Sequence, residues 1–110
     1  MFAVIYRSYL KDGRELEYQH YWEKIARYFV KEKGALRSTL HQADDGMWVA
    51  YSRWPNSEAR DAAWPKDGME GRICLPSEIQ QAILGLRDCI NAERKIPEIC
   101  MNIVKEIIQF

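Results

Sequence analysis

The chain has 110 residues, of which 47% are hydrophobic and 29% charged, values typical of a single globular domain that spans residues 1–110. Its 16 Lys and Arg residues balance its 16 Asp and Glu residues, so there is no net charge to attract nucleic acid or an anionic membrane surface. No apolar run approaches the roughly 20 residues of a membrane span, and the 3 widely spaced cysteines fit neither a disulfide framework nor a zinc site, which together predict a cytosolic protein.

The N-terminal part of the chain predicts a strand followed by a helix. Residues 2–10 are rich in β-branched and aromatic side chains and end at the turn signal Lys11-Asp12-Gly13, which indicates a strand. From Glu15 to Lys33 the sequence has neither Gly nor Pro, and Gly34 follows as a helix-ending residue. Apolar side chains recur there at helical spacing, at Tyr18, Trp22, Ile25 and Phe29. This spacing predicts an amphipathic helix.

A β-hairpin is predicted next, from residues 35–43 and 47–54. The intervening Asp44-Asp45-Gly46 fits a three-residue loop with Gly in the left-handed position, which pairs Ala43 with Met47. In this register one face carries Leu36, Ser38, Leu40, Gln42, Trp48, Ala50, Ser52 and Trp54. The opposite face carries Arg37, Thr39, His41, Met47, Val49, Tyr51 and Arg53. The first face is apolar at its ends and small in the middle, and the second is mixed.

Two further helices and a last strand complete the pattern. A capping signal and an acidic first turn predict a short helix over residues 57–64, which the Pro and Gly of residues 65–68 break. Residues 76–78 open a third helix that ends before Pro97. Its apolar face is marked by Ile79, Ile83, Leu86 and Ile90. The apolar, β-branched segment 98–110 is predicted to supply the last strand.

The order of these elements, β-α-β-β-α-α-β, predicts an α+β fold. It closes most simply as a four-stranded antiparallel sheet with the helices on one face, the ferredoxin-like arrangement. The other face would hold Met47, Val49 and Tyr51, which are too apolar to leave in water. A second copy of the sheet is the natural cover, so the sequence predicts a homodimer with two-fold symmetry.

The most specific stretch of the chain is residues 34–59. It holds a glycine, a strand with Leu40 and His41, an acidic-Gly turn, a strand that ends in Trp54, and Ser57-Glu58-Ala59 at the start of a helix. Together with "FAVIYR" near the N-terminus, this pattern resembles the antibiotic-biosynthesis monooxygenase-like family of the dimeric α+β barrel superfamily, and the resemblance covers most of the chain. It implies a homodimer in which two sheets face each other, with a small pocket in each subunit between sheet and helices.

Members of that family differ in function. They include cofactor-free oxygenases that oxidise polycyclic phenols, haem-degrading oxygenases, and proteins that only bind small molecules. The resemblance implies a monooxygenase without a cofactor that acts on a small aromatic or quinone-forming substrate; the alternative is a non-catalytic, small-molecule-binding or structural homodimer. Haem degradation is less favoured, because "VIYRSYL" lacks the Asn and "SEARDAAW" lacks the His that haem-degrading relatives carry in the first strand and second helix.

Candidate site residues are aromatic and hydrogen-bonding side chains, because the family's oxygen chemistry needs a substrate anion that is formed, held and kept from water. The candidate substrate-binding residues are Tyr6, Arg7, Trp22, Trp48 and Trp54. The candidate catalytic residues are His41, Tyr51 and Arg53. Core packing is the alternative for the tryptophans, and a structural hydrogen bond across the dimer is the alternative for the histidine.

Three arginines and one tryptophan lead to more specific expectations. Arg7, Arg37 and Arg53 form one basic cluster if the first strand presents its odd positions on their face, but the sequence does not fix that parity, and ion pairs with the partner chain are the alternative. Trp54 ends a strand just before a proline, and small residues on the same face leave space beside it. We therefore expect Trp54 to wall an aromatic-binding pocket between sheet and helices, together with Trp48 and Trp22, and not to fill a core.

Overall fold

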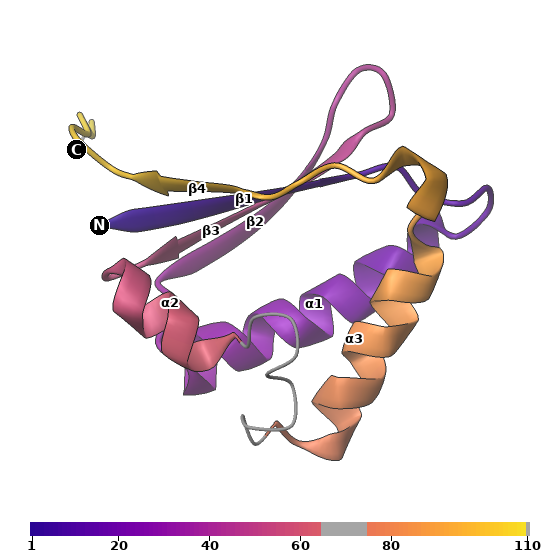
Figure 1. Cartoon of the computed structure of the whole chain (residues 1–110), viewed down its shortest axis with the longest axis horizontal. Helices are drawn as coiled ribbons and strands as arrows, with labels where there is room; N and C mark the ends of the chain where they lie inside the picture. The colour runs from indigo at the N-terminus through magenta and orange to yellow at the C-terminus, as the bar shows by residue number, and fades with distance from the viewer. Residues whose placement is uncertain (65–74, 110) are drawn as a thin grey trace.

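The computed structural model describes residues 1–64 and 75–109, which form an α+β fold (Figure 1). Its strands are β1 (Phe2–Ser8), β2 (Arg37–Gln42), β3 (Trp48–Trp54) and β4 (Ile99–Asn102). Its helices are α1 (Glu15–Glu32), α2 (Ser57–Ala63), α3 (Ser77–Cys89) and a short 3-10 helix, η2 (Ala92–Arg94). The strands form one antiparallel sheet in the order β2-β3-β1-β4. The predicted ferredoxin-like fold is confirmed.

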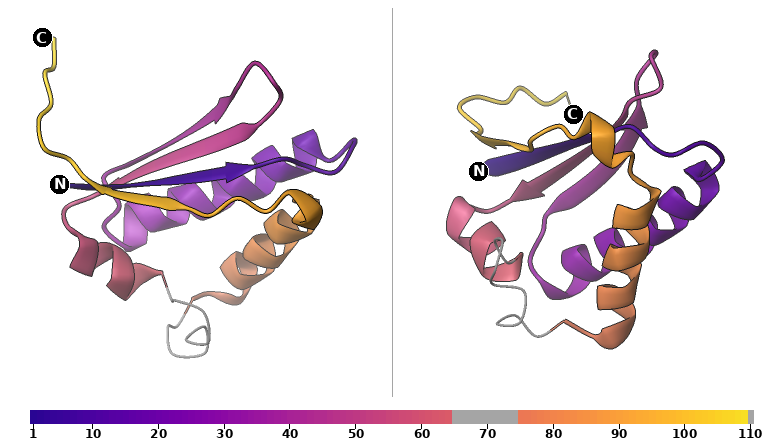
Figure 2. Two further views of the ribbon diagram at one scale, coloured as in Figure 1. Left: turned by 45° about the horizontal axis from the view of Figure 1, so that its top comes forward. Right: turned by 45° about the vertical axis from the view of Figure 1, so that its right-hand side comes forward.

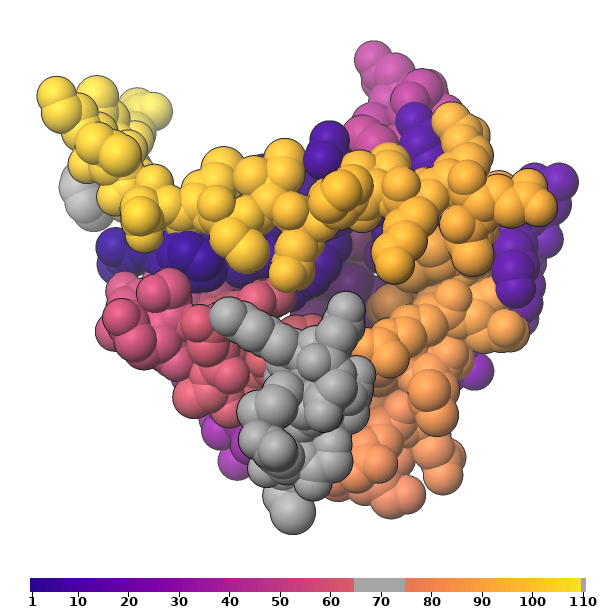
Figure 3. Space-filling model, in the orientation of Figure 1, coloured from indigo at the N-terminus to yellow at the C-terminus, as the bar shows by residue number. Residues whose placement is uncertain are grey.

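The sheet has one face covered by helices and one open face. Figures 1 and 2 show α1, α2 and α3 on the same side of the sheet, while the tip of the β2–β3 hairpin and the C-terminal segment project away from them. In the space-filling view, β4 and the segment that leads to it form the near edge of the sheet, and the C-terminal residues stand clear of the rest of the surface (Figure 3). We call the two sides the helix face and the open face.

The register of the β2–β3 hairpin follows from its turn, as predicted. The Ala43 N–H donates to the Met47 carbonyl at 2.7 Å, and the Gly46 N–H donates to the Ala43 carbonyl at 2.9 Å. Gly46 has a φ of 91°, the left-handed conformation that the three-residue loop requires. The pairing then runs from Gln42 opposite Trp48 to Arg37 opposite Arg53. The predicted division of the hairpin into two faces is therefore confirmed.

The structure also fixes the face parity of β1, which the sequence leaves open. Phe2 lies opposite Trp54, and the register continues through Val4, Tyr6 and Ser8, so the even positions of β1 belong to the helix face. The odd positions, including Arg7, belong to the open face with Arg53. The three arginines named above thus share one face. They do not form one cluster, however, because Arg7 lies opposite Val49 at the far end of the strand from Arg53.

The hydrophobic core lies on the helix face in two clusters. One contains Val4, Phe29, Ala35, Trp54, Ala63, Ile79 and Ile83. The other contains Tyr18, Trp48 and Cys89. Both clusters join a strand to α1 and α3, so the helices are held to the sheet at two separate places.

Helix boundaries follow local signals. The Asn56 side-chain oxygen accepts the Ala59 N–H at 2.8 Å and caps α2 close to its predicted start. At the end of α1, Gly34 has a φ of 86°, and the next residue donates its N–H to the Phe29 carbonyl at 3.2 Å. Within residues 1–64 and 75–109, no helix is both long enough and apolar enough to cross a bilayer.

Two predicted strands are shorter than expected, and one predicted break lies outside the described residues. β1 ends at Ser8, because Leu10 forms only an isolated bridge with Ile90. The segment predicted as a strand over 98–110 pairs only over Ile99–Asn102. The Ile103 N–H still donates to the Met1 carbonyl at 2.8 Å, but there the partner strand ends, so the rest of the segment leaves the sheet. The predicted helix break at 65–68 falls in the part of the chain that is not described.

Candidate functional site

A cavity of ≈ 300 Å³ lies on the helix face, between the sheet and the helices. Its floor is formed by Tyr6 and Ser8 of β1, Ser38 of β2, and Ala50, Ser52 and Trp54 of β3. Its walls are formed chiefly by Tyr18, Trp22, Ile25, Ala26 and Phe29 of α1, Trp64 after α2, and Ile83, Leu86 and Arg87 of α3. The cavity thus lies between the two core clusters and is lined by members of each.

The cavity exists above the sheet because small side chains lie between two tryptophans on β3. Trp48 packs on Tyr18 with ring centroids 5.7 Å apart, and Trp54 packs on Phe29 at 6.4 Å. Between them along the helix face, β3 has only Ala50 and Ser52, and Ser52 pairs across the strands with another serine. Each tryptophan therefore anchors one core cluster, and the small residues leave the space between the clusters unfilled.

Tyr6 brings the main polar group of the floor. Its hydroxyl lies 3.1 Å from Nη2 of Arg60, and the same Nη2 donates to Glu98 Oε2 at 2.7 Å. Burial raises the pKa of Tyr6 above its ordinary value, although the hydrogen bond from Arg60 opposes the shift. Burial likewise raises the pKa of Tyr18 to about 12. Both phenols therefore stay protonated at neutral pH, and they can donate hydrogen bonds in the cavity.

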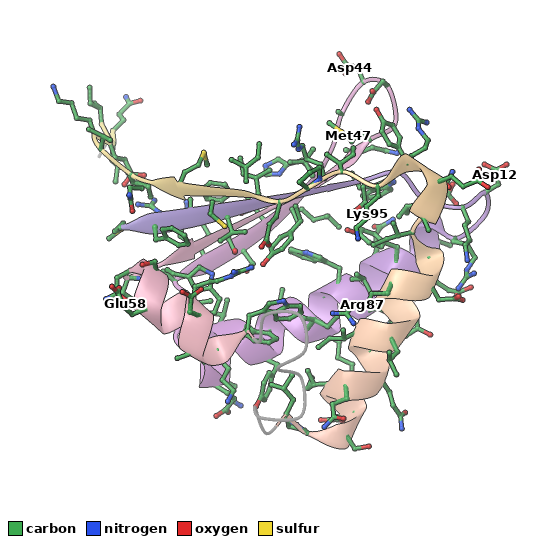
Figure 4. All side chains as sticks on the ribbon, in the orientation of Figure 1. Asp12, Asp44, Met47, Glu58, Arg87 and Lys95 are labelled. Atoms are coloured by element: carbon green, nitrogen blue, oxygen red, sulfur yellow. The ribbon has the colours of Figure 1, made fainter. Side chains whose placement is uncertain are left out.

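The remaining lining is mostly apolar and lacks an obvious base. Among the described residues that line the cavity there is no His, Asp or Glu, and Arg87 is the only charged side chain. Figure 4 shows Arg87 extending from α3 toward α1, on the side where the helices converge beneath the sheet. No group of three or more potential metal ligands is found within residues 1–64 and 75–109. The cavity can hold a flat aromatic molecule and offer it hydrogen-bond donors.

Some of the predicted substrate-binding residues meet in this cavity. Tyr6, Trp22 and Trp54 line it from three different elements. Trp54 is also 4% exposed and belongs to a core cluster, so it is at once a wall and a core residue, two roles that the sequence-based expectation separates. Trp48 lies on the same face but outside the lining, where it packs against Tyr18 and Cys89.

The other predicted residues lie on the open face. Arg7 donates to the Pro97 carbonyl at 3.3 Å, and His41 Nδ1 lies 3.2 Å from the Val49 carbonyl. The strand alternation directs the Tyr51 side chain to the same face, although Tyr51 borders the cavity between its two small neighbours. In this chain the sheet lies between the cavity and the side chains of Arg7 and His41, whereas Tyr51 still borders the cavity. A site that these residues share with the tryptophans stays a prediction.

Arg53 also lies on the open face, with a partner that the sequence did not predict. Its Nη1 and Nη2 each lie 2.6 Å from a carboxylate oxygen of Glu106, in the C-terminal segment of the same chain. The guanidinium thus makes a bidentate ion pair. Within this chain the acidic partner of Arg53 is thus supplied by the C-terminal segment, and ion pairs with a second chain stay a prediction.

The site residues predicted from the sequence included neither Arg60, which donates to Tyr6, nor Arg87, which lines the cavity. Arg60 is 5% exposed and lies beside the buried Ala63 on the inner side of α2. Arg87 follows Ile83 by four residues, so it continues the apolar stripe of α3. In both cases an arginine lies one helical turn from a buried apolar residue, although Arg87 itself is exposed. That pattern is the signal that could have identified them.

Comparison with known proteins agrees with this architecture. The family model for antibiotic biosynthesis monooxygenases matches residues 1–65. Among solved structures, SnoaB from Streptomyces nogalater, a cofactor-independent oxygenase, superposes with a TM-score of 0.71 at 15% identity, with 98% of this chain and 97% of that chain covered. Rv0793 from Mycobacterium tuberculosis gives a TM-score of 0.69 at 15% identity, with 96% of each chain covered.

The fold is also similar to that of an archaeal protein. A conserved protein from Methanosarcina mazei Go1 superposes with a TM-score of 0.67 at 11% identity, with 91% of this chain and 89% of that chain covered. No curated protein matches the sequence. At such identities the superpositions establish the fold, and a shared fold does not fix a shared substrate.

Proposed function

Because this chain belongs to the antibiotic biosynthesis monooxygenase family, we propose that it is a cofactor-independent monooxygenase of a small aromatic or quinone-forming substrate. The observation that carries the proposal is the cavity of ≈ 300 Å³ walled by the indoles of Trp22, Trp54 and Trp64. That volume lies at the lower end of the range of about 300 to 1,000 Å³ found for ligand pockets. It suits a compact polycyclic ring, which would stack against the indoles.

In the proposed reaction the substrate and O2 supply all the electrons and oxygen atoms, and the protein only binds the substrate anion. The substrate anion gives an electron to O2, and the resulting radical pair combines to a carbon-bound hydroperoxide once a proton is taken up. Loss of the remaining C–H proton and cleavage of the O–O bond then leave a carbonyl group and release the second oxygen as water. The oxidised carbon supplies all the electrons that O2 accepts, so no further reductant is consumed. The cavity contributes by holding the anion and excluding water.

The test is oxygen uptake with 1,8-dihydroxyanthrone, which oxidation converts to an anthraquinone. We expect uptake of one O2 per quinone formed, at a rate well above that in buffer. Ser38→Phe fills the cavity floor and should lower the rate by about a hundredfold, because a displaced substrate loses its productive orientation. Thr39→Phe, at the next and exposed position of β2, is the matched control. A rate no higher than in buffer contradicts the proposal.

A second candidate function, a non-catalytic small-molecule binder, is favoured by one observation. The described lining of the cavity holds no His, Asp or Glu, which are the usual general bases at neutral pH. A binder needs no such base. Saturable binding of the anthrone with no oxygen uptake would support this function over the monooxygenase.

The proposal includes a homodimer formed through the open face. Val49 and Tyr51 lie half-buried on that face, and Ile99 of β4 is exposed on the same face, with Ile5 of β1 between it and Tyr51. The C-terminal segment adds Val104, 87% exposed, and Ile107, 100% exposed. Exposed apolar side chains of this kind on one side of a sheet are typical of an interface. A mass measurement in solution tests this, and a monomer at micromolar concentration contradicts it.

We also propose that the protein is cytosolic. The described cysteines, Cys89 and Cys100, are free thiols, and the second is exposed. Free exposed thiols persist in reducing compartments. Alkylation of the protein as isolated from cells should therefore modify Cys100 without prior reduction, and a blocked Cys100 would contradict the proposal.

A further inference from the structure

The Tyr6 hydroxyl is arranged to donate a hydrogen bond into the cavity. It lies 3.1 Å from Arg60 Nη2. A guanidinium can only donate, so the phenol oxygen accepts in this bond and its own proton must point elsewhere. Among the described residues, Arg60 is the sole hydrogen-bond partner of this hydroxyl. Since Tyr6 lines the cavity, a ligand oxygen is the natural acceptor for the proton.

Arg60 is buried but held as a cation. Its side chain also bonds Glu98 Oε2 at 2.7 Å and lies 3.7 Å from the Asp61 carboxylate. Burial by itself lowers the pKa of Arg60, but the bond to Tyr6 and the nearby Glu98 charge raise it above its ordinary value. Its Nε is buried and has no partner among the described residues. A cation so placed polarises the phenol that it touches and strengthens it as a donor.

A second positive group stands at the rim of the same cavity. Arg87 is exposed, yet it contributes to the lining from α3 (Figure 4). Tyr6 on the sheet side thus offers a donor, and Arg87 on the helix side offers positive charge, around an otherwise apolar space. The charge of Arg60 behind Tyr6 is balanced by Glu98. The described lining contains no carboxylate that would repel an anion. Its electrostatic character suits a planar molecule with negative charge on an oxygen.

We propose that Tyr6, positioned and polarised by Arg60, binds the charged oxygen of a ligand that enters the cavity as the anion of an acidic phenol or enol. This inference rests on the proposed function and names its substrate class. Because the described lining offers no base, the cavity selects molecules that ionise in water before they bind. Tyr6 contacts the ligand, and Arg60 acts through Tyr6 as a positioning residue. The Trp22 and Trp54 rings would hold the apolar part.

The experiment compares two coloured probes that share one ring system. At pH 7, 2-hydroxy-1,4-naphthoquinone is an anion, whereas 2-methoxy-1,4-naphthoquinone is neutral. Binding to the full chain is followed by quenching of tryptophan fluorescence. We expect the anion to bind at least about tenfold more tightly, because a hydrogen bond to a charged group contributes more than one to a neutral group.

The variants separate the ligand contact from a structural role. Tyr6→Phe removes one oxygen atom and should lower affinity for the anion by about 10- to 100-fold while affinity for the neutral probe stays within about twofold. Arg60→Met should act in the same direction, and Arg60→Lys should restore part of the preference. Arg27→Met, on the exposed side of α1, is the matched control for loss of an arginine. If Arg60→Met fails to fold, Tyr6→Phe still tests whether the Tyr6 hydroxyl binds the anionic probe.

Each outcome bears on a different statement. Equal affinity for the two probes in the wild type, or an unchanged preference for the anion in Tyr6→Phe, overturns the inference. An equal loss of affinity for both probes in Arg60→Met means that Arg60 only supports the fold, and overturns its positioning role. Oxygen uptake combined with equal affinities leaves the proposed function standing. If neither probe quenches and the anthrone is not oxidised, both the function and the inference fail.

Discussion

The two faces of β3 differ in what covers them, because the helices lie over one face and no described helix lies over the other. On the helix face, Trp48 and Trp54 are 8% and 4% exposed, and each anchors a core cluster beside the cavity. On the open face, Val49 and Tyr51 alternate with them and lie half-buried without a helix above. Because successive side chains point to opposite faces, substitutions at neighbouring positions should affect different properties of the molecule.

Each face also has an arginine held by a glutamate near the C-terminus. Arg60 on the helix face bonds Glu98 at 2.7 Å, and Arg53 on the open face bonds Glu106 at 2.6 Å. They differ in what else they touch. Arg60 also holds a phenol that lines the cavity, whereas Arg53 holds a segment that leaves the sheet and also donates to Met1 Sδ at 3.1 Å. The comparison suggests that the first pair serves the site and the second serves the surface.

The largest expected effect is that of Trp54→Ala. Truncation of a buried Trp typically lowers the free energy of unfolding by about 3 to 5 kcal/mol, and Trp54 is buried against Phe29. Tyr51→Ala, on the same strand but on the open face, should cost clearly less when measured at a dilution that prevents association. Urea denaturation of both variants provides the measurement. An equal or larger loss for Tyr51→Ala would break the distinction between the faces.

The next largest effect should come from Val49→Asp. A carboxylate at this half-buried position of the open face would be desolvated by a second sheet, so self-association should weaken by about 2 kcal/mol or more. Light scattering after gel filtration should show a fall in mass toward that of one chain, 13.0 kDa. Leu84→Asp, at an exposed position of α3, is the control and should leave the mass unchanged. A wild-type mass of one chain would contradict the dimer itself.

These contrasts show which parts of the structure could be predicted from the sequence. The hairpin register and its two faces follow from Gly46 and from period-two alternation, because both are local. The parity of β1 relative to β3 depends on pairing between segments more than 40 residues apart, such as Tyr6 with Ala50, and no local signal encodes it. For that reason the sequence could not decide whether Arg7 shares a face with Arg53, as it does in the structure.

The candidate site, like the fold, was predictable only where its features are local in the sequence. Small residues between two tryptophans indicated the space that the cavity occupies. The Arg60–Tyr6–Glu98 group was not predictable, because α2, β1 and the segment before β4 meet only through the tertiary fold. The short length of β4 was equally hidden, since it is set by where its partner strand begins at Phe2.

A third prediction concerns how closely the helices that cover the cavity approach each other. A Cβ atom at Gly85 of α3 would lie 2.6 Å from Cζ of Tyr21 on α1, which is too close for a relaxed contact. Gly85→Ala should therefore lower stability by about 1 to 3 kcal/mol through overpacking. In a Tyr21→Ala background the same change should stabilise by about 0.5 to 1 kcal/mol, because alanine is the better helix former. Urea denaturation of the four proteins tests this change of sign.

A stabilising effect of Gly85→Ala in both backgrounds would show that the Tyr21 ring moves aside freely. The helix layer would then be looser than the contact implies. Gln81→Ala, at an exposed position one turn earlier in α3, controls for helix propensity alone.

The smallest expected effect is local and concerns the ion pair on the open face. The hydrogen bonds from Arg53 lower the pKa of Glu106 below its ordinary value. A carboxylate with a lowered pKa in the folded state contributes to stability above its ordinary pKa, and this contribution is lost as the pH falls through the lowered value. Acid should therefore release the C-terminal segment before the sheet unfolds. The measurement is an NMR titration of the backbone amides of residues 103–109.

Glu106→Gln separates this pair from a general effect of acid. The neutral side chain should leave the amides of residues 103–109 as mobile at pH 7 as acid leaves them in the wild type, with little change in melting temperature. Glu32→Gln, at the exposed end of α1, should leave them unaffected. If the segment is equally ordered in Glu106→Gln, then Arg53 does not hold it. Its apolar residues, including the fully exposed Ile107, would then be ordered by packing on a second copy, which would make the segment part of the dimer interface.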